Sequence, residues 1–125
     1  QVKRVIRTNY SNPPTHGGSV VAAVLSSPEL RGLWETELAT MRNRIRAMRE
    51  SFVEKLKAKG VAEDFSFILR QRGMFSYTGL SAEQVARLQS EFGIYAVSTG
   101  RICVAALNTR NIDYAVDSLA TVLKG

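Results

Sequence analysis

Apolar residues recur every three or four positions between residues 28 and 59, which is the spacing of one face of an α-helix. These positions are Leu30, Trp34, Leu38, Met41, Ile45, Met48, Phe52 and Leu56. Ser26 or Ser27 is a suitable N-cap before Pro28, and Gly60 follows the last apolar position. The pattern predicts one helix over residues 28–59, about 45 Å long, which can brace two domains.

Two shorter segments precede this helix. Residues 1–10 mix basic and apolar side chains and run toward Pro13 and Pro14, which favour an extended connection. Residues 15–25 contain a run of apolar side chains, which predicts a short and mostly buried helix.

Beyond Gly60 the apolar spacing changes from one segment to the next. Residues 65–69 and 74–77 alternate or run apolar, and residues 94–97 form another short apolar run, so each of the three predicts a strand. Between them, Ser81 followed three positions later by a glutamine forms a capping box, which predicts the start of another helix.

The last part of the chain predicts a strand and a helix. Residues 102–107 are apolar without a break, as in a strand that is buried on both faces. Asn108 or Thr109 is a suitable cap for a final helix. Its inward positions are Ile112, Val116, Leu119 and Leu123. The order of elements predicts an α/β fold, resembling an α+β small domain, with helices covering a small sheet and one long interdomain helix.

Composition narrows the class of protein. The chain has 125 residues, the usual size of one domain, and 45% are hydrophobic, enough for one core. It has no apolar run near the roughly 20 residues of a membrane-spanning helix, and residues 1–7 lack the apolar part of a signal peptide. The single cysteine, Cys103, excludes an internal disulfide and fits a reducing compartment, so we expect a cytoplasmic protein and a buried, inert thiol.

The net charge of +6 makes nucleic-acid binding an alternative to weigh. Acidic residues are interleaved with the basic ones, and Arg46 precedes Glu50 by one helical turn, as in a surface ion pair. The sequence contains no RNA-recognition motif and no aromatic series for stacking bases. We expect a solvated helix face, with neither nucleic acid nor membrane as a partner.

The sequence does not predict a metal site or a self-sufficient catalytic site. His16 is the only histidine, and no cysteine pair, nucleophile elbow, Walker loop or dinucleotide fingerprint is present. We expect His16 to pack or to cap a helix, and we expect no catalytic residue within this chain.

Two arginines occupy positions suited to anion binding. Arg101 follows Gly100 at the start of an apolar run, and its permanently charged fork matches a carboxylate. An internal acid, an anionic ligand or solvent at a strand end can each satisfy it. Arg7 precedes the proline segment, close to the hydrogen-bonding groups of Ser11 and Asn12, and taken alone it is most simply a surface arginine.

Three segments bring a resemblance to a known family. They are residues 7–17 (RTNYSNPPTHG), residues 72–80 (RGMFSYTGL) and residues 92–97 (FGIYAV), the last followed by Gly100-Arg101. Together they strongly resemble the aspartate and aromatic aminotransferases, which are fold-type I enzymes that use pyridoxal 5′-phosphate (PLP). The resemblance extends in order over nearly the whole chain. The residues of these segments look closest to those of the bacterial aromatic branch.

The resemblance implies roles for five residues. Arg101 would bind the α-carboxylate of the substrate, and Arg7 would reach across a homodimer to a distal carboxylate. Ser11 and Asn12 would line that entrance between subunits. Phe75, otherwise most simply a core aromatic, would lie on a segment that closes over the substrate.

The resemblance also implies how the chain is divided. Residues 1–27 would end a large domain and form the loop between subunits, residues 28–59 would link the domains, and residues 60–125 would form a small C-terminal domain. The complete enzyme would exchange amino groups between an aromatic or dicarboxylic amino acid and 2-oxoglutarate. The lysine, aspartate and phosphate-binding groups for PLP would lie upstream, so the cofactor-binding residues are unknown and this chain alone is expected to be inactive.

Two positions depart from the family pattern. Thr99 and Cys103 stand where the family usually has serine and asparagine, which leaves the choice between aspartate and aromatic substrates open. The alternatives to an aminotransferase are a free-standing, non-enzymatic module that binds a small carboxylate through Arg101, and a basic interaction domain.

Overall fold

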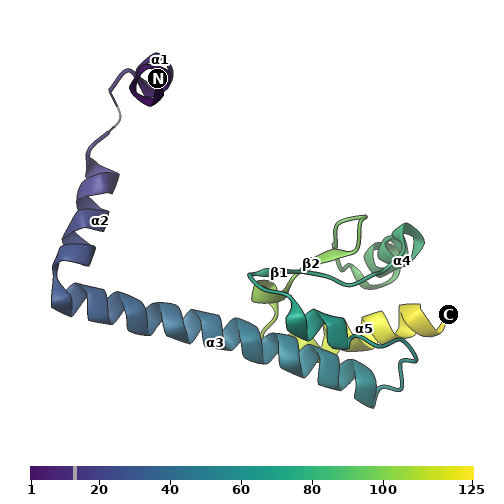
Figure 1. Cartoon of the computed structure of the whole chain (residues 1–125). Coiled ribbons are helices and arrows are strands. Elements are labelled where there is room, and N and C mark those ends of the chain that lie inside the picture. The colour runs from purple at the N-terminus through teal and green to yellow at the C-terminus, as the bar shows by residue number, and fades with distance from the viewer. Residues whose placement is uncertain (13) are drawn as a thin grey trace. The chain divides into compact units, whose positions relative to one another are not determined.

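The structure, a computed structural model, describes residues 1–12 and 14–125. Its elements (Figure 1) are α1 (Val2–Tyr10), α2 (His16–Ser26), α3 (Pro28–Ala58), η1 (Ser66–Arg70), β1 (Phe75–Tyr77), α4 (Ala82–Phe92), β2 (Arg101–Cys103), η2 (Val104–Ala106) and α5 (Ile112–Lys124), where η marks a 3-10 helix. The chain divides into two compact units, Gln1–Thr40 and Met41–Gly125, and α3 contributes residues to both.

The first unit contains α1, α2 and the beginning of α3. The sequence predicted no element over residues 1–10, but Val2–Tyr10 forms α1. The helix predicted over residues 15–25 is confirmed as α2. The predicted burial of that helix is wrong, since α2 contains no buried residue. An apolar face is buried only where another element packs on it. The extended connection was predicted partly on Pro13, which lies outside the described residues.

The long helix is confirmed as α3, Pro28–Ala58. The hydroxyl oxygen of Ser27 accepts the Leu30 N–H at 3.3 Å and caps the N-terminus. Gly60, with φ +69°, follows the C-terminus as expected. The second half of the apolar stripe packs on the core through Ile45, Met48, Phe52 and Leu56. None of the helices formed by residues 1–12 and 14–125 is long and apolar enough to cross a membrane.

The second unit has one continuous apolar core. Its buried members come from α3, α4, α5, both 3-10 helices and the segments between them. They are Phe52, Leu56, Phe65, Ile68, Leu80, Val85, Leu88, Val104, Leu107, Ile112, Val116, Leu119 and Val122. The sequence pattern therefore places the helices correctly around a shared core.

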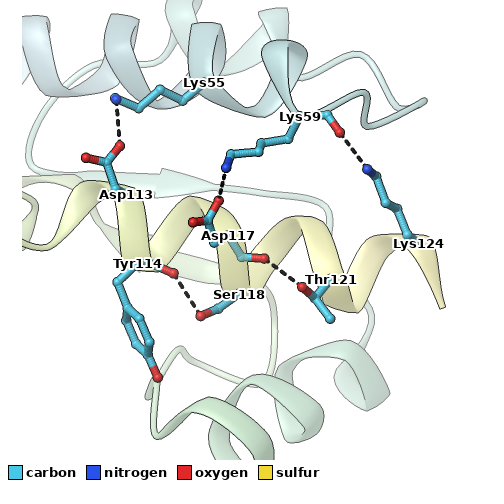
Figure 2. Close-up of polar contacts among 8 residues, drawn as sticks. All are labelled: Lys55, Lys59, Asp113, Tyr114, Asp117, Ser118, Thr121 and Lys124. Carbon is cyan, nitrogen blue, oxygen red and sulfur yellow. Dashed lines mark hydrogen bonds and ion pairs between the residues drawn. The ribbon is translucent and has the colours of Figure 1, made fainter.

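Polar contacts join α3 to α5 beside this core (Figure 2). Lys55 Nζ lies 2.6 Å from Asp113 Oδ1, and Lys59, just after the end of α3, pairs with Asp117 one turn further along α5. The hydrogen bond and the charge of Asp117 raise the pKa of Lys59 above its ordinary value. Lys124 donates to the Lys59 carbonyl oxygen at 2.6 Å, which ties the end of α5 to the end of α3. These exposed contacts orient the helices more than they stabilise them.

The two strands β1 and β2 pair antiparallel. Phe75 lies opposite Cys103, Ser76 opposite Ile102, and Tyr77 opposite Arg101. The predicted fold class, helices around a small sheet, is therefore confirmed, as is the strand predicted over residues 74–77.

The strand predicted over residues 65–69 is wrong, because Ser66–Arg70 forms the 3-10 helix η1. The Asp64 carboxylate accepts the Ser66 N–H at 2.8 Å and the Ser66 hydroxyl at 2.7 Å, which bends the chain where a strand would extend. Such local side-chain bonds compete with strand formation. Phe65 and Ile68, three residues apart, then both reach the core.

Two further strand predictions need correction. Residues 94–97 form no strand, since the Val97 carbonyl accepts the Gly100 N–H at 2.8 Å and closes a turn there. The strand over residues 102–107 ends at Cys103 and continues as η2, and its first residues are only half-buried. Phe75, Tyr77 and Arg101 are exposed on one face of the two described strands, so β2 is not covered on both faces as a strand of a parallel sheet is.

Helix caps were predicted with mixed success. The capping box of α4 is confirmed, with Ser81 and Gln84 bonded reciprocally between side chain and backbone. The cap predicted at Asn108 or Thr109 is wrong: α5 begins at Ile112, after Asn111. Asn111 Oδ1 accepts the Asn108 N–H at 2.8 Å, so these side chains stabilise a turn that delays the helix.

Candidate functional site

Arg101 and Phe75 lie on facing strands, and their side chains contact each other. The guanidinium carbon of Arg101 is 5.0 Å from the centre of the Phe75 ring, within the range of a cation–π interaction. Phe75 is 45% exposed, so the interpretation of a plain core aromatic is wrong. The ring supports one face of the guanidinium and leaves its planar edge to other partners.

The backbone before Arg101 is fixed by the segment that follows β1. The Thr78 N–H and hydroxyl both donate to the Gly100 carbonyl oxygen, at 2.9 and 2.7 Å. Gly100 has φ +81°, and a Cβ there would lie 3.0 Å from the Leu80 carbonyl oxygen. Position 100 therefore requires glycine both for its conformation and for its lack of a side chain.

Arg101 has no ion-pair partner in the part of the chain that the structure describes, residues 1–12 and 14–125. Arg101 is the first residue of β2, and it is exposed. The alternative of an internal ion pair is therefore wrong for the described residues. Two interpretations of Arg101 fit this exposure: a strand end in solvent and a binding site for an external anion. The residues around Arg101 distinguish between them.

Arg101 lines a pocket of about 340 Å³ between α4, α5, β2 and residues 94–97. The walls are mainly apolar and include Phe75, Leu88, Ile94, Val97, Ile102, Cys103 and Leu119. Arg101 is the only charged residue that lines this pocket among the described residues. A concave apolar surface with one fixed cation favours an anionic group at that end.

Arg7, Ser11 and Asn12 lie together at the end of α1, in the other unit. Arg7 Nη1 donates to the Ser11 carbonyl oxygen at 3.0 Å, and the Asn12 N–H donates to the Tyr10 carbonyl oxygen at 2.6 Å. All of these residues are exposed. The structure therefore groups the three residues that the sequence singled out in this segment, as one cluster on the first unit.

Sequence analysis missed an arginine behind the β1–β2 pair. Arg49 is only 6% exposed and donates from Nη2 to the Gly73 carbonyl oxygen at 2.7 Å. The signal was present, because Arg49 precedes Phe52 by three residues and Leu56 by seven and so lies on the apolar stripe of α3. A charged residue at an inward position marks a buried polar contact.

The comparison with protein families matches nearly the whole chain. The family described as aminotransferase class I and II matches residues 1–119. The aspartate aminotransferase of Pseudomonas aeruginosa is 68% identical over 123 residues, covering 98% of this chain and 31% of the relative. The aromatic-amino-acid aminotransferase of Escherichia coli is 49% identical over 123 residues, with the same coverage. This chain therefore spans about a third of the length of the curated relatives it matches.

Solved structures agree with the sequence comparison. The aromatic-amino-acid aminotransferase from Burkholderia pseudomallei, covalently bound to pyridoxal phosphate, superposes with a TM-score of 0.94 at 71% identity, covering 97% of this chain and 30% of that one. A mitochondrial aspartate aminotransferase from Trypanosoma brucei gives a TM-score of 0.91 at 44% identity, covering 94% of this chain and 31% of that one.

Proposed function

This chain belongs to the class I and II aminotransferases, and from that premise we propose that it is the C-terminal part of an enzyme that binds substrate carboxylates. The complete enzyme transfers an amino group between an aromatic or dicarboxylic amino acid and 2-oxoglutarate. The observation that carries the proposal is the exposed Arg101 guanidinium, which rests on Phe75 and has no ion pair with the described residues.

Arg101 holds the α-carboxylate that every amino acid substrate has. Its planar fork donates two parallel hydrogen bonds to the two carboxylate oxygens, which fixes the orientation of the substrate as well as its position. Phe75 restrains the guanidinium from one side, so less freedom is lost when the carboxylate binds. Orientation matters because the reacting bond must be aligned with the cofactor.

PLP is the cofactor that we propose for the complete enzyme, in keeping with the pyridoxal phosphate bound to the Burkholderia pseudomallei neighbour. When bound, PLP supplies an electron sink for the amino acid. The pocket beside Arg101 is lined by no lysine among the described residues, so its donors fit a substrate carboxylate and do not fit PLP attachment. The groups that hold PLP then belong to other parts of the enzyme, and this chain alone is inactive.

The remaining roles concern the assembly of the enzyme. Arg7 reaches the distal carboxylate of a dicarboxylic substrate in the partner subunit of a homodimer, with Ser11 and Asn12 beside it. The hydrogen bond from Arg7 to the Ser11 carbonyl supports a shared location for this cluster. Residues 1–27 end the large domain, residues 28–59 link the domains, and residues 60–125 form the small domain. The enzyme is cytoplasmic.

The proposed amino donor is an aromatic or a dicarboxylic amino acid. The relatives named above comprise aspartate and aromatic-amino-acid aminotransferases, at 68% and 49% identity. Thr99 and Cys103 lie two residues before and after Arg101, and Cys103 also lines the pocket, so these two departures from the family pattern are the proposed influence on preference. The alternative of a non-enzymatic carboxylate-binding module is not favoured, because the named relatives and solved structures are all aminotransferases.

The test uses the complete enzyme with added PLP. Aspartate, tyrosine and phenylalanine serve as amino donors, and glutamate formed from 2-oxoglutarate is measured. Arg101→Lys keeps the charge but loses the fork, so kcat/KM should fall about 10- to 100-fold for all three donors. Arg110→Lys, in an exposed turn, is the matched control and should leave kcat/KM unchanged. Absence of amino transfer, or an unaffected Arg101→Lys enzyme, would contradict the proposal.

A further inference from the structure

Arg49 is a buried cation whose hydrogen bonds all go to one short segment. Its Nη2 donates to the Gly73 carbonyl oxygen at 2.7 Å, and its Nε lies 3.4 Å from the Ser76 hydroxyl oxygen. No ion pair to Arg49 occurs among residues 1–12 and 14–125. A buried guanidinium is tolerated only when hydrogen bonds replace its water, so Arg49 is committed to these acceptors.

The two acceptors define the start and the rear face of β1. Gly73, with φ +82°, forms the turn that leads into the strand, and Ser76 is 2% exposed on the face turned toward α3. Side chains alternate between the faces of a strand, so Phe75 points away from Arg49. Arg49 therefore contacts the face of β1 that is turned toward α3. Phe75, whose ring contacts Arg101, lies on the opposite face.

A second arginine of α3 holds the segment after β2 in a similar way. Arg44 donates from Nη1 to the Leu107 carbonyl oxygen and from Nη2 to the Ala105 carbonyl oxygen, both at 2.9 Å. The Ala105 N–H in turn donates to the Met74 carbonyl oxygen at 3.3 Å, which joins the segment after β2 to the start of β1. The start of β1 and the end of β2 lie at the same end of the antiparallel pair, and the segments beside both are bonded to α3 through arginine side chains.

We propose that Arg49 is a positioning residue for binding of the substrate α-carboxylate. It fixes β1 against α3 and thereby sets the place of Phe75, which in turn sets the orientation of the Arg101 guanidinium. The inference rests on the function proposed above, because it needs Arg101 to bind the carboxylate. Beyond that function, an arginine of α3 that does not touch the substrate sets the orientation of Arg101.

The main variant is Arg49→Met in the complete enzyme with PLP, because methionine keeps most of the volume and removes the donors. KM for aspartate and for phenylalanine should rise about tenfold, within the roughly hundredfold effect of a misplaced binding group. The kcat per folded enzyme should change much less. A merely structural role would lower the melting temperature and the active fraction, and would leave KM unchanged.

Matched variants separate position from charge. Arg49→Lys keeps one donor for the Gly73 carbonyl and should restore part of the affinity. Ser76→Ala removes one acceptor and should raise KM about threefold. Arg46→Gln removes a positive charge from the same helix at a side chain that is 78% exposed and paired with Glu50, and should leave KM unchanged. If Arg49→Met does not fold, the Arg49→Lys and Ser76→Ala enzymes decide the question.

A double-mutant cycle tests whether Arg49 acts through Arg101. Binding of succinate, which has carboxylates but no amino group, is measured by calorimetry on the complete enzyme. In the Arg101→Lys background, Arg49→Met should weaken succinate much less than it does in the parent. The inference is overturned if Arg49→Met weakens succinate binding equally in both backgrounds. It is also overturned if Arg49→Met has no effect in the parent while Arg101→Lys weakens binding. In both cases the proposed function still stands. No effect of Arg101→Lys itself overturns the proposed function.

Discussion

Thr78 donates twice to the carbonyl oxygen of Gly100, through its N–H at 2.9 Å and through its hydroxyl at 2.7 Å. This carbonyl belongs to the peptide that immediately precedes Arg101. The direction in which β2 begins is therefore fixed by the residue that follows β1, in a region where Thr78 itself is buried. The position of the guanidinium depends on this backbone arrangement as much as on its own strand.

Replacing Gly100 should destabilise the protein more than replacing another glycine of similar conformation. Gly100→Ala places a Cβ at φ +81°, 3.0 Å from the Leu80 carbonyl oxygen and 3.1 Å from the Leu80 nitrogen, which the backbone cannot easily relieve. Gly93→Ala has φ +64° but meets nothing within 4 Å. The left-handed conformation costs about 1–2 kcal/mol in each case, so only Gly100→Ala should exceed this in thermal or urea unfolding. Equal losses would show that the close approach is unimportant.

Replacing Phe75 should weaken both classes of substrate to a similar degree. Phe75→Leu removes the ring from beneath Arg101, and an exposed cation–π contact contributes about 0.5–1 kcal/mol, which corresponds to a rise in KM of about two- to fivefold. The α-carboxylate is common to aspartate and phenylalanine, so both should respond alike in steady-state kinetics of the complete enzyme. Met74→Leu, at a neighbouring exposed side chain outside the pocket lining, is the control.

Replacing Arg7 should affect dicarboxylic substrates selectively. Arg7→Gln removes the charge proposed for the distal carboxylate, so kcat/KM for aspartate should fall about 10- to 100-fold while that for phenylalanine changes little. Arg4→Gln, one turn earlier on the same exposed helix, controls for a lost surface charge. Equal losses for aspartate and phenylalanine would contradict the role assigned to Arg7.

Asp64 should make the stability of the second unit sensitive to acid. Hydrogen bonds from the Ser66 N–H and hydroxyl lower the pKa of Asp64 below its ordinary value of about 3.9. Its contribution is therefore fully present above that ordinary value and is lost as the pH falls through the lowered pKa. Asp64→Asn should reduce the fall in melting temperature between about pH 5 and pH 3.

The control for this pH effect is Glu63→Gln, which removes one negative charge from the same loop. The difference between the Asp64→Asn and Glu63→Gln profiles isolates the hydrogen bonds to Ser66 from the general effect of charge. Identical profiles for the two variants would contradict the cap that the structure places at the start of η1.

Several elements could be predicted because the information is local. The stripe of α3 and the Ser81 capping box each depend on residues within a few positions of one another. The strand predicted over residues 65–69 failed for a local reason as well. The short alternating pattern was outweighed by two hydrogen bonds from Ser66 to the Asp64 carboxylate, which periodicity does not register.

The sequence determined that Arg101 stands after a glycine at the start of an apolar run, and it carried the resemblance to the aminotransferases. Tertiary structure decided what surrounds that arginine. Phe75 lies beneath it, Thr78 holds the preceding peptide, and Arg49 supports β1 from the rear. These partners lie 23 to 52 positions away along the chain and meet only when α3 and the strand pair fold together, so a linear pattern cannot reveal their contacts.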